Sequence, residues 1–244
     1  MKTILYRNLR ISVSSWPDLL QSIQTAFKTP GLDIIVTLNP QAMVLSSKDK
    51  YRSLFKTYFA EASLILPESE GLVWALSREC GNFETSALTR KPGIDLFQKL
   101  LSFPATVYLL GASQSVSEAS VAKIKVEYPD CHIVGHHHGF FLEEESSAIY
   151  SEIAHLNPDL IFVAMGMPRQ EQLILDLKSY CKSGVIIGIG GSLDVFSGRL
   201  KRAPLWMRLC KLEWLFRGLQ EPKRVIGWSY LLRFCYNTLR KKGF

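Results

Sequence analysis

The sequence contains no apolar run long enough to cross a bilayer. Hydrophobic residues make up 47% of its 244 residues, yet no uninterrupted apolar stretch reaches the ~18 that a spanning helix needs. The first twelve residues have neither a long apolar segment nor a small-residue cleavage site, so we expect no signal peptide. We therefore predict a soluble protein, or one that lies on a membrane surface, built as one domain or as one domain with an appendage.

Cysteines are few, odd in number and far apart. None of the five forms a C-x-x-C pair; they are Cys80, Cys131, Cys181, Cys210 and Cys235. This spacing predicts free thiols in a reducing cytosol and argues against a disulfide framework or a cysteine zinc site.

Metal-ligand spacing is also absent. His136, His137 and His138 are consecutive, and no Cys, Asp or Glu stands at ligand spacing beside them. Neighbours along a strand or loop cannot all point at one ion. We expect no metal and no other cofactor. We interpret the run as a place where a histidine hydrogen-bonds a nucleotide or a sugar.

The glycine-rich segment Gly188-Ile-Gly190-Gly191-Ser192 lacks two parts of a dinucleotide fingerprint. The third glycine would fall at Leu193, and no acidic residue stands ~20 positions further on, where the ribose would be bound. We therefore reject NAD binding. A simple tight turn and a loop whose N–H groups contact phosphate or sugar both remain open.

Positive charge is concentrated near the C-terminus. Residues 199–244 hold twelve Lys or Arg and two Glu, a net charge of +10, so residues 1–198 carry −3 of the total of +7. This asymmetry predicts an anionic partner, such as phosphate groups, an acidic membrane or nucleic acid. We expect an α/β core over 1–198 and a basic helical appendage over 199–244.

Predicted strands and helices alternate through the core. This order predicts an α/β fold: a mostly parallel, Rossmann-like sheet with helices on both faces. The polar, turn-rich segment 82–93 is expected to be a mobile loop. The predicted strands are 4–13, 33–37, 63–66, 105–110, 131–134, 159–164 and 185–189, and the predicted helices are 16–28, 41–60, 72–78, 95–101, 115–127, 143–156 and 171–181.

Polar residues follow several of the predicted strands. Ligands bind at the carboxyl ends of strands in open α/β sheets. Glu68 follows one strand in a Pro- and Gly-bounded loop, where a base can reach a bound hydroxyl; the alternative is a solvated loop glutamate. Asp194 and Asp95 stand beside glycine turns, where helix capping competes with a role in binding.

The appendage is predicted to form two helices, 206–219 and 223–242, with aromatic and aliphatic residues beside Lys and Arg. Basic, Trp-bearing amphipathic helices lie on anionic bilayers. Its cations are expected to bind a diphosphate, the alternative being a solvated face. They are Arg199, Lys201, Arg202, Arg208, Arg217 and Arg224. We expect the appendage not to bind nucleic acid, since its aromatic residues suit lipid equally well. Binding to nucleic acid would be recognised by an affinity that weakens steeply with salt.

In order and spacing, motifs along nearly the whole chain resemble those of the bacterial WecG/TagA/CpsF glycosyltransferases, glycosyltransferase family 26. They are Thr37-x-Asn39, Leu66-Pro67, Gly71-Leu-Val-Trp74-Ala75, Arg90 before Gly93-x-Asp95-Leu96, Leu110-Gly111-Ala112, Gly135-x-His-His-Gly139-Phe-Phe141, Pro158-Asp159, Gly166-Met-Pro-Arg-Gln170-Glu171, Gly188-x-Gly-Gly-Ser192-x-Asp194-Val-Phe-Ser-Gly198, Lys201-Arg-Ala-Pro204, Leu212-Glu-Trp-Leu215 and Glu221-Pro222.

The resemblance implies an inverting, metal-independent transferase of cell-envelope polysaccharide or exopolysaccharide synthesis. Such enzymes move N-acetylmannosamine, its uronic acid or a related hexose from UDP to a polyprenyl-diphosphate-linked saccharide. They work at the cytoplasmic face of the cell membrane, to which the appendage helps attach them. A homo-oligomer is left open. A non-catalytic nucleotide- or membrane-binding module that retains the fold is the alternative.

The resemblance also implies roles for single residues. Thr37 and Asn39 match polar pocket residues and join Glu68 as catalytic candidates. The substrate-binding candidates are Arg90, near the diphosphate, with Gly111, Ala112, Gly135, His138, Phe140, Gly166, Gln170, Gly190, Gly191, Ser192 and Asp194. The family's pattern reads Pro-Asp-Gly where this chain has Pro67-Glu68-Ser69, so here the carboxylate lies one methylene further from the backbone.

Overall fold

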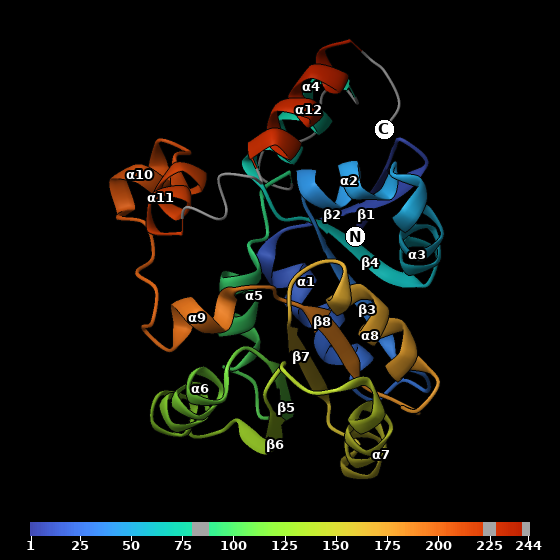
Figure 1. Cartoon of the computed structure of the whole chain (residues 1–244), viewed down its shortest axis with the longest axis vertical. Helices are drawn as coiled ribbons and strands as arrows, with labels where there is room; N and C mark the ends of the chain where they lie inside the picture. The colour runs from blue at the N-terminus through green and yellow to red at the C-terminus, as the bar shows by residue number, and fades with distance from the viewer. Residues whose placement is uncertain (80–87, 222–227, 241–244) are drawn as a thin grey trace.

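The chain folds around a six-stranded parallel sheet (Figure 1). In this computed structural model we describe residues 1–79, 88–221 and 228–240. The strand order is β4-β3-β8-β7-β5-β6, and every neighbouring pair is parallel. The strands are β3 (Asp33–Leu38), β4 (Ala62–Pro67), β5 (Thr106–Gly111), β6 (His132–His137), β7 (Leu160–Ala164) and β8 (Val185–Gly188). The predicted α/β class is confirmed.

Successive side chains of each central strand enter two different cores. In β3, Ile34 and Val36 face one cluster and Ile35 faces the other, because side chains alternate along a strand. One face is covered by α1 (Trp16–Ala26), α5 (Gly93–Leu100), α6 (Gln114–Glu127) and α9 (Ser192–Phe196). The other is covered by α2 (Pro40–Ser46), α3 (Asp49–Ala60), α4 (Glu70–Glu79), α7 (Ser146–Leu156) and α8 (Arg169–Lys178). Helices therefore lie on both faces, as predicted.

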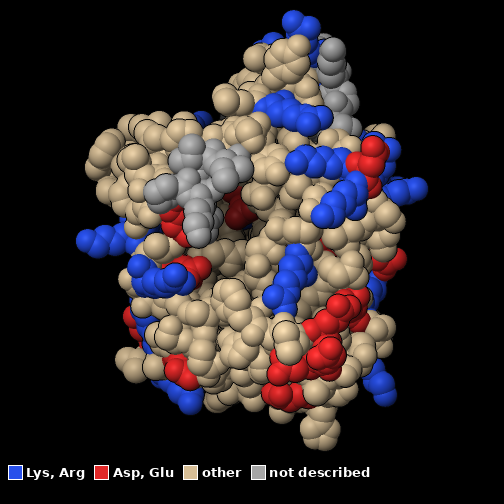
Figure 2. All heavy atoms as spheres, in the orientation of Figure 1, with Lys and Arg blue, Asp and Glu red and all other residues tan. Residues whose placement is uncertain are grey.

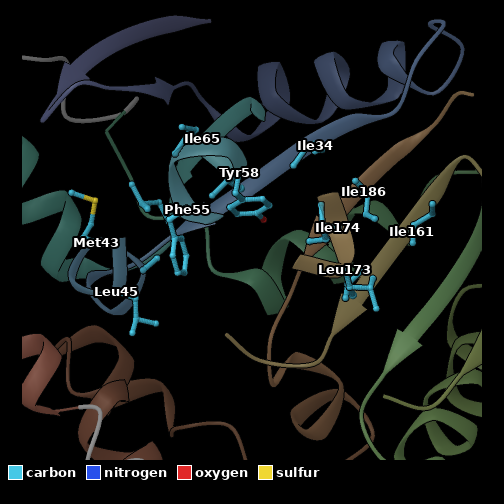
Figure 3. Packing of buried hydrophobic residues seen from close by; sticks show 14 of the residues in the cluster. Ile34, Met43, Leu45, Phe55, Tyr58, Ile65, Ile161, Leu173, Ile174 and Ile186 are labelled. Carbon is cyan, nitrogen blue, oxygen red and sulfur yellow. The ribbon is translucent and has the colours of Figure 1, made fainter. Parts of the chain in front are cut away.

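Figure 3 shows the second of these cores. Phe55 and Tyr58 project from α3, Tyr58 on the side of Leu173 and Ile174 of α8, and Phe55 on the side of Met43 and Leu45 of α2. These side chains are almost completely removed from solvent. This packing fixes α3 and α8 beside the carboxyl ends of the strands, where the polar segments emerge.

The predicted strand 4–13 is wrong in one respect: it is a hairpin of β1 (Lys2–Tyr6) and β2 (Leu9–Val13), separate from the main sheet. Arg7 and Asn8 form its turn with φ values of 50° and 64°. Two successive left-handed residues give the tight turn whose twist matches antiparallel strands. Apolar periodicity continues across this turn, which is why the sequence reads as one strand.

Two predicted helices are each divided in the structure. Helix 41–60 is α2 and α3, because the hydroxyls of Ser46 and Ser47 bond back to the carbonyls of Met43 and Val44 and end α2. Helix 206–219 is α10 (Leu205–Leu209) and α11 (Glu213–Gln220), with Lys211 left-handed at a φ of 61° between them. Predicted helix 143–156 begins with one 3-10 turn, η1 (Glu143–Glu145), before α7.

The last helix, α12 (Trp228–Leu239), returns to the core. It packs beside α2 and α4 (Figure 1) and buries Phe234 and Thr238. Parts of the predicted loop 82–93 and helix 223–242 lie outside the described residues, as do Cys80 and Arg224. Cys131, Cys181, Cys210 and Cys235 are free thiols. The division at residue 198 into two domains stays a prediction.

In the described ranges, no helix combines the length and hydropathy that a membrane span needs. The final segment nevertheless exposes many large apolar side chains. Among the described residues beyond position 199, eight belong to this set: Leu205, Trp206, Leu209, Trp214, Leu219, Leu232, Tyr236 and Leu239.

Candidate active site

Two cavities open at the carboxyl edge of the sheet. The strand-end cavity, of about 400 Å³, is lined by the residues that follow β3, β4, β7 and β8. The tail cavity, of about 590 Å³, lies between the segments after β3 and β4 and the helices α11 and α12. Both are lined by Asn39, Gln41, Glu68 and Arg217, so the two cavities meet at these four side chains. Figure 2 shows a hollow in the upper part of one face with acidic atoms deep inside it.

Glu68 lies at this junction. It follows β4, and its Oε2 accepts a hydrogen bond of 2.9 Å from Asn39 Nδ2. Burial raises the pKa of Glu68 above its ordinary value, and the charge of Glu213 adds to this effect. The bonds from Asn39 and from the backbone N–H of Gly93, together with the charge of Arg217, lower the pKa in part. A half-buried carboxylate held in this way is a stronger base than a solvated one.

Thr37 lies near the end of β3 and Asn39 follows it directly. Asn39 caps α2: its Oδ1 accepts from the N–H of Ala42 at 3.0 Å, which leaves Nδ2 to hold Glu68. Thr37 Oγ1 donates to the carbonyl of Gly188 at 2.9 Å and ties the end of β3 to the end of β8. The structure therefore brings all three catalytic candidates together.

The glycine-rich segment after β8 is shaped by Gln170. The Gln170 Oε1 accepts from Gly190 N at 3.0 Å, and Gly190 has a φ of 51°. A Cβ at position 188 would lie 2.3 Å from Gln170 Nε2, so a larger residue there would displace this amide. Gly190, Gly191, Ser192, Gly166 and Gln170 all line the strand-end cavity. The segment is a loop supported by a buried amide and not only a tight turn.

A second group of predicted binding residues lies at the ends of β5 and β6, outside the lining of both cavities. Gly111 has a φ of 134°, and a Cβ there would lie 2.3 Å from the carbonyl of Ala164. His138 Nδ1 accepts from the exposed Phe140 N–H at 3.2 Å. Ala112, Gly135 and Asp194 also lie outside both linings.

The three consecutive histidines each have a separate partner. His136 Nδ1 bonds to Ser117 Oγ at 3.1 Å, and His137 Nδ1 bonds to the carbonyl of His138 at 2.8 Å. Throughout the described part of the chain, no group of three or more His, Cys, Asp or Glu is arranged to hold a metal.

Arg90 joins the core to the final helices. Its Nη1 lies 2.8 Å from Glu213 Oε2 and its Nε lies 3.3 Å from Glu70 Oε1, while Lys211 Nζ lies 3.4 Å from Glu70 Oε2. Burial would raise the pKa of Glu213, but the hydrogen bond from Arg90 and the charges of Arg217, Arg90 and Arg202 hold it below its ordinary value. These ion pairs form one wall of the tail cavity.

The predicted diphosphate cations are dispersed. Arg217 reaches both cavities. Arg199 pairs with Asp194 at 3.0 Å, and Arg202 pairs with Asp95 at 2.5 Å. Lys201 is exposed and Arg208 is half-buried; neither lines a cavity, and Arg224 lies outside the described residues.

Sequence reasoning missed the aromatic wall of the tail cavity. Trp214, Trp228 and Tyr230 line it, and the two indole rings meet edge to face with centroids 5.2 Å apart. A Cβ at Gly218 would lie 2.6 Å from Trp228, so this glycine lets the indole ring lie against α11. The amphipathic pattern identified these aromatic residues as surface residues, since it carries no information about which helices meet.

Glu171 was also missed as an individual residue. It follows Gln170 on α8, is 3% exposed and lines the strand-end cavity with Tyr58. Burial raises the pKa of Glu171 to about 7, and the charge of Glu68 adds to this; hydrogen bonds from its own backbone and from Gln170 act in the opposite direction. A signal was present, because the residue stands in the Gly166–Glu171 motif, but helix-start glutamates are usually solvated.

Comparison with known proteins agrees with this arrangement. The sequence profile of the Glycosyl transferase WecG/TagA/CpsF family matches residues 4–244. A Bacillus subtilis (strain 168) protein named N-acetylglucosaminyldiphosphoundecaprenol N-acetyl-beta-D-mannosaminyltransferase is 36% identical over 219 residues, covering 86% of this chain and 82% of the relative. A Staphylococcus aureus (strain MW2) protein of the same name is 32% identical over 234 residues, covering 92% and 87%. The chain belongs to the WecG/TagA/CpsF family of glycosyltransferases.

Proposed function

We propose that this glycosyltransferase moves a sugar from a UDP-sugar to a saccharide linked to polyprenyl diphosphate, with inversion at the anomeric carbon. The observation that carries the proposal is the position of Glu68, which lines both cavities. A transferase must hold its donor and its acceptor on two sides of one base. The junction of the two cavities meets this requirement, because Glu68 lies between them.

The strand-end cavity is assigned to the donor sugar. It is polar, and its wall contains the supported glycine loop, whose backbone N–H groups suit a phosphate or a sugar. The curated relatives are named as N-acetylmannosaminyltransferases. We therefore propose N-acetylmannosamine as the first donor sugar to test, ahead of its uronic acid and related hexoses.

The tail cavity is assigned to the acceptor. It combines two indole rings and Leu231 with the cations Arg90 and Lys211. Aromatic and aliphatic surface suits a saccharide and the start of a lipid chain, and guanidinium groups suit diphosphate oxygens. The relatives' names describe an acceptor of this class, N-acetylglucosaminyldiphosphoundecaprenol.

In the proposed reaction, Glu68 takes the proton of the acceptor hydroxyl as that oxygen attacks the anomeric carbon. The bond between this carbon and the UDP oxygen breaks, and UDP leaves with the electron pair. Attack from the face opposite the leaving group inverts the anomeric centre. Arg217 and the N–H groups of the glycine loop meet the charge that develops on UDP, so this proposal assigns no step to a metal.

We further propose that the enzyme is peripheral on the inner face of the cell membrane. Leu205, Trp206 and Leu209 expose their side chains on α10, and the surrounding segment carries the positive charge of the chain. Apolar side chains that enter the interface, together with cations that attract anionic lipids, give this kind of attachment. An acceptor held in that membrane would then reach the tail cavity from the lipid side.

The test is a screen of UDP-sugars against a synthetic polyprenyl-diphosphate N-acetylglucosamine, with products identified by mass spectrometry and repeated with a chelator. We expect one added N-acetylhexosamine, stoichiometric UDP, and turnover unaffected by chelation. UDP binding without transfer to any acceptor would favour the alternative, a non-catalytic module that retains the fold. Loss of turnover with the chelator, restored by a divalent ion, would refute the metal-free mechanism.

A further inference from the structure

Glu171 lines the strand-end cavity and has a buried polar atom that is unsatisfied in the described part of the structure. Its Oε1 accepts a long hydrogen bond of 3.3 Å from Gln170 Nε2. Its Oε2 is buried and has no hydrogen-bond partner among the described residues. A buried polar atom is normally satisfied, so an unpaired one on a residue that lines a cavity calls for an explanation, and a bound molecule is one that the cavity could supply.

The surroundings of Glu171 leave it without a counter-charge. The ionisable residues that line the same cavity are Tyr58 from α3, Glu68 after β4 and Arg217 from α11. On α8 itself, the guanidinium of Arg169 donates to the carbonyl of Phe141 at 2.7 Å. Arg217 also lowers the pKa of both Glu68 and Glu213, and so is shared among acids. No cation faces Glu171 alone in the described lining.

Burial raises the pKa of both carboxyl groups of the cavity, but their other surroundings differ. For Glu68, the hydrogen bonds from Asn39 and Gly93 and the attraction of Arg217 act against the effect of burial and favour the charged form. Glu171 is more deeply buried, and the charge of Glu68 disfavours a second charge beside it. Two acids whose environments differ in this way can take different roles, one as a base and the other as a neutral hydrogen-bond donor.

We propose that Glu171 is a sugar-binding residue of the strand-end cavity, whose protonated carboxyl donates a hydrogen bond from Oε2 to an oxygen of the donor sugar. The inference rests on the proposed function and deepens it by naming a contact to the sugar and not to UDP. A hydroxyl or acetyl oxygen of the sugar would accept this hydrogen bond. Because the sugar is neutral, it brings no charge that would ionise Glu171.

The test measures the affinity of UDP and of UDP-N-acetylmannosamine by titration calorimetry between pH 6 and pH 8.5. The proteins are the wild type, Glu171→Ala and Glu171→Gln. The matched control is Asp176→Asn on the same helix, where the carboxylate accepts from Gln172 at the half-exposed surface. Circular dichroism checks that each variant is folded.

At pH 6 we expect Glu171→Ala to bind the UDP-sugar roughly tenfold more weakly, the loss of one buried hydrogen bond, with UDP affinity unchanged. Glu171→Gln, which keeps an N–H donor, should stay within about threefold of the wild type. Wild-type affinity for the UDP-sugar should fall as pH rises through 7, whereas that of Glu171→Gln should fall less. The control should follow the wild type.

Three results would overturn the inference. Equal losses for UDP and UDP-sugar in Glu171→Ala would mean that Glu171 only supports Gln170 and the glycine loop. Affinity that rises with pH in the wild type alone would mean that a carboxylate accepts from the sugar. Unchanged UDP-sugar affinity in Glu171→Ala would remove the contact. If the wild type bound no UDP-sugar at all, the proposed function would fail and this inference with it.

Discussion

The buried acid Glu171 should make the protein less stable as pH rises. Its pKa is about 7 in the folded protein, against an ordinary value of 4.5 that the unfolded chain regains. A raised folded pKa means that the folded state holds the proton more tightly. Its stabilising contribution is present in full below pH 4.5 and is lost as pH rises toward 7.

The difference of about two and a half pKa units corresponds to roughly 3 kcal/mol, most of which is lost between pH 5 and pH 8. Glu171→Gln removes this titration. The change in unfolding free energy caused by the substitution should therefore be roughly 2–3 kcal/mol more favourable at pH 8 than at pH 5. Costs of the amide that do not depend on pH cancel in this comparison.

The measurement is urea unfolding followed by circular dichroism for the wild type, Glu171→Gln and Asp176→Asn at pH 5 and pH 8. Asp176→Asn should show no such pH-dependent gain. If Glu171→Gln changes stability by the same amount at both pH values, Glu171 is not a buried acid with a raised pKa, and the assignment of a neutral donor is wrong.

Three further experiments test the roles of the final helices. Gly218→Ala places a methyl group against an indole ring and should cost about 1–3 kcal/mol of unfolding free energy; Gly71→Ala, a helical glycine with ordinary contacts nearby, should instead be neutral or stabilising by up to about 1 kcal/mol. A double-mutant cycle of Arg90→Met and Glu213→Gln should give a coupling of about 1 kcal/mol, because the pair is only partly exposed; a coupling near zero would mean that the ion pair does not fix α11. Leu209→Ser removes a side chain that is 74% exposed and should weaken flotation with anionic vesicles severalfold without changing stability, whereas unchanged flotation would refute membrane contact through α10.

The parallel sheet explains why much of the site could be predicted. Thr37, Asn39, Glu68 and Gln170 lie at or after the ends of strands that the sequence pattern places in one sheet. The carboxyl ends of parallel strands meet at one edge. Their convergence therefore follows from topology. A side chain at position 188 would displace Gln170, and this reason for the glycine becomes visible only in three dimensions.

The sequence could not predict which residues that lie far apart in the chain contact one another. Arg90 pairs with Glu213, 123 positions away, and this pairing depends on how α11 docks. Gly218 and the ring of Trp228 interlock for the same reason. Helical periodicity also continued through Ser46 and Ser47, where local hydroxyl bonds end the helix. In each case the deciding contact is a packing or hydrogen-bond detail that apolar spacing does not encode.

The central claim, that Glu68 is the base between donor and acceptor, is tested most directly by the turnover of Glu68→Gln. The amide keeps the size of the side chain and removes its ability to take a proton. We expect kcat to fall ~10²–10⁴-fold, with the affinity for UDP unchanged; the matched control Glu61→Gln, at the exposed end of α3, should leave kcat unchanged. Undiminished kcat in Glu68→Gln would contradict the account.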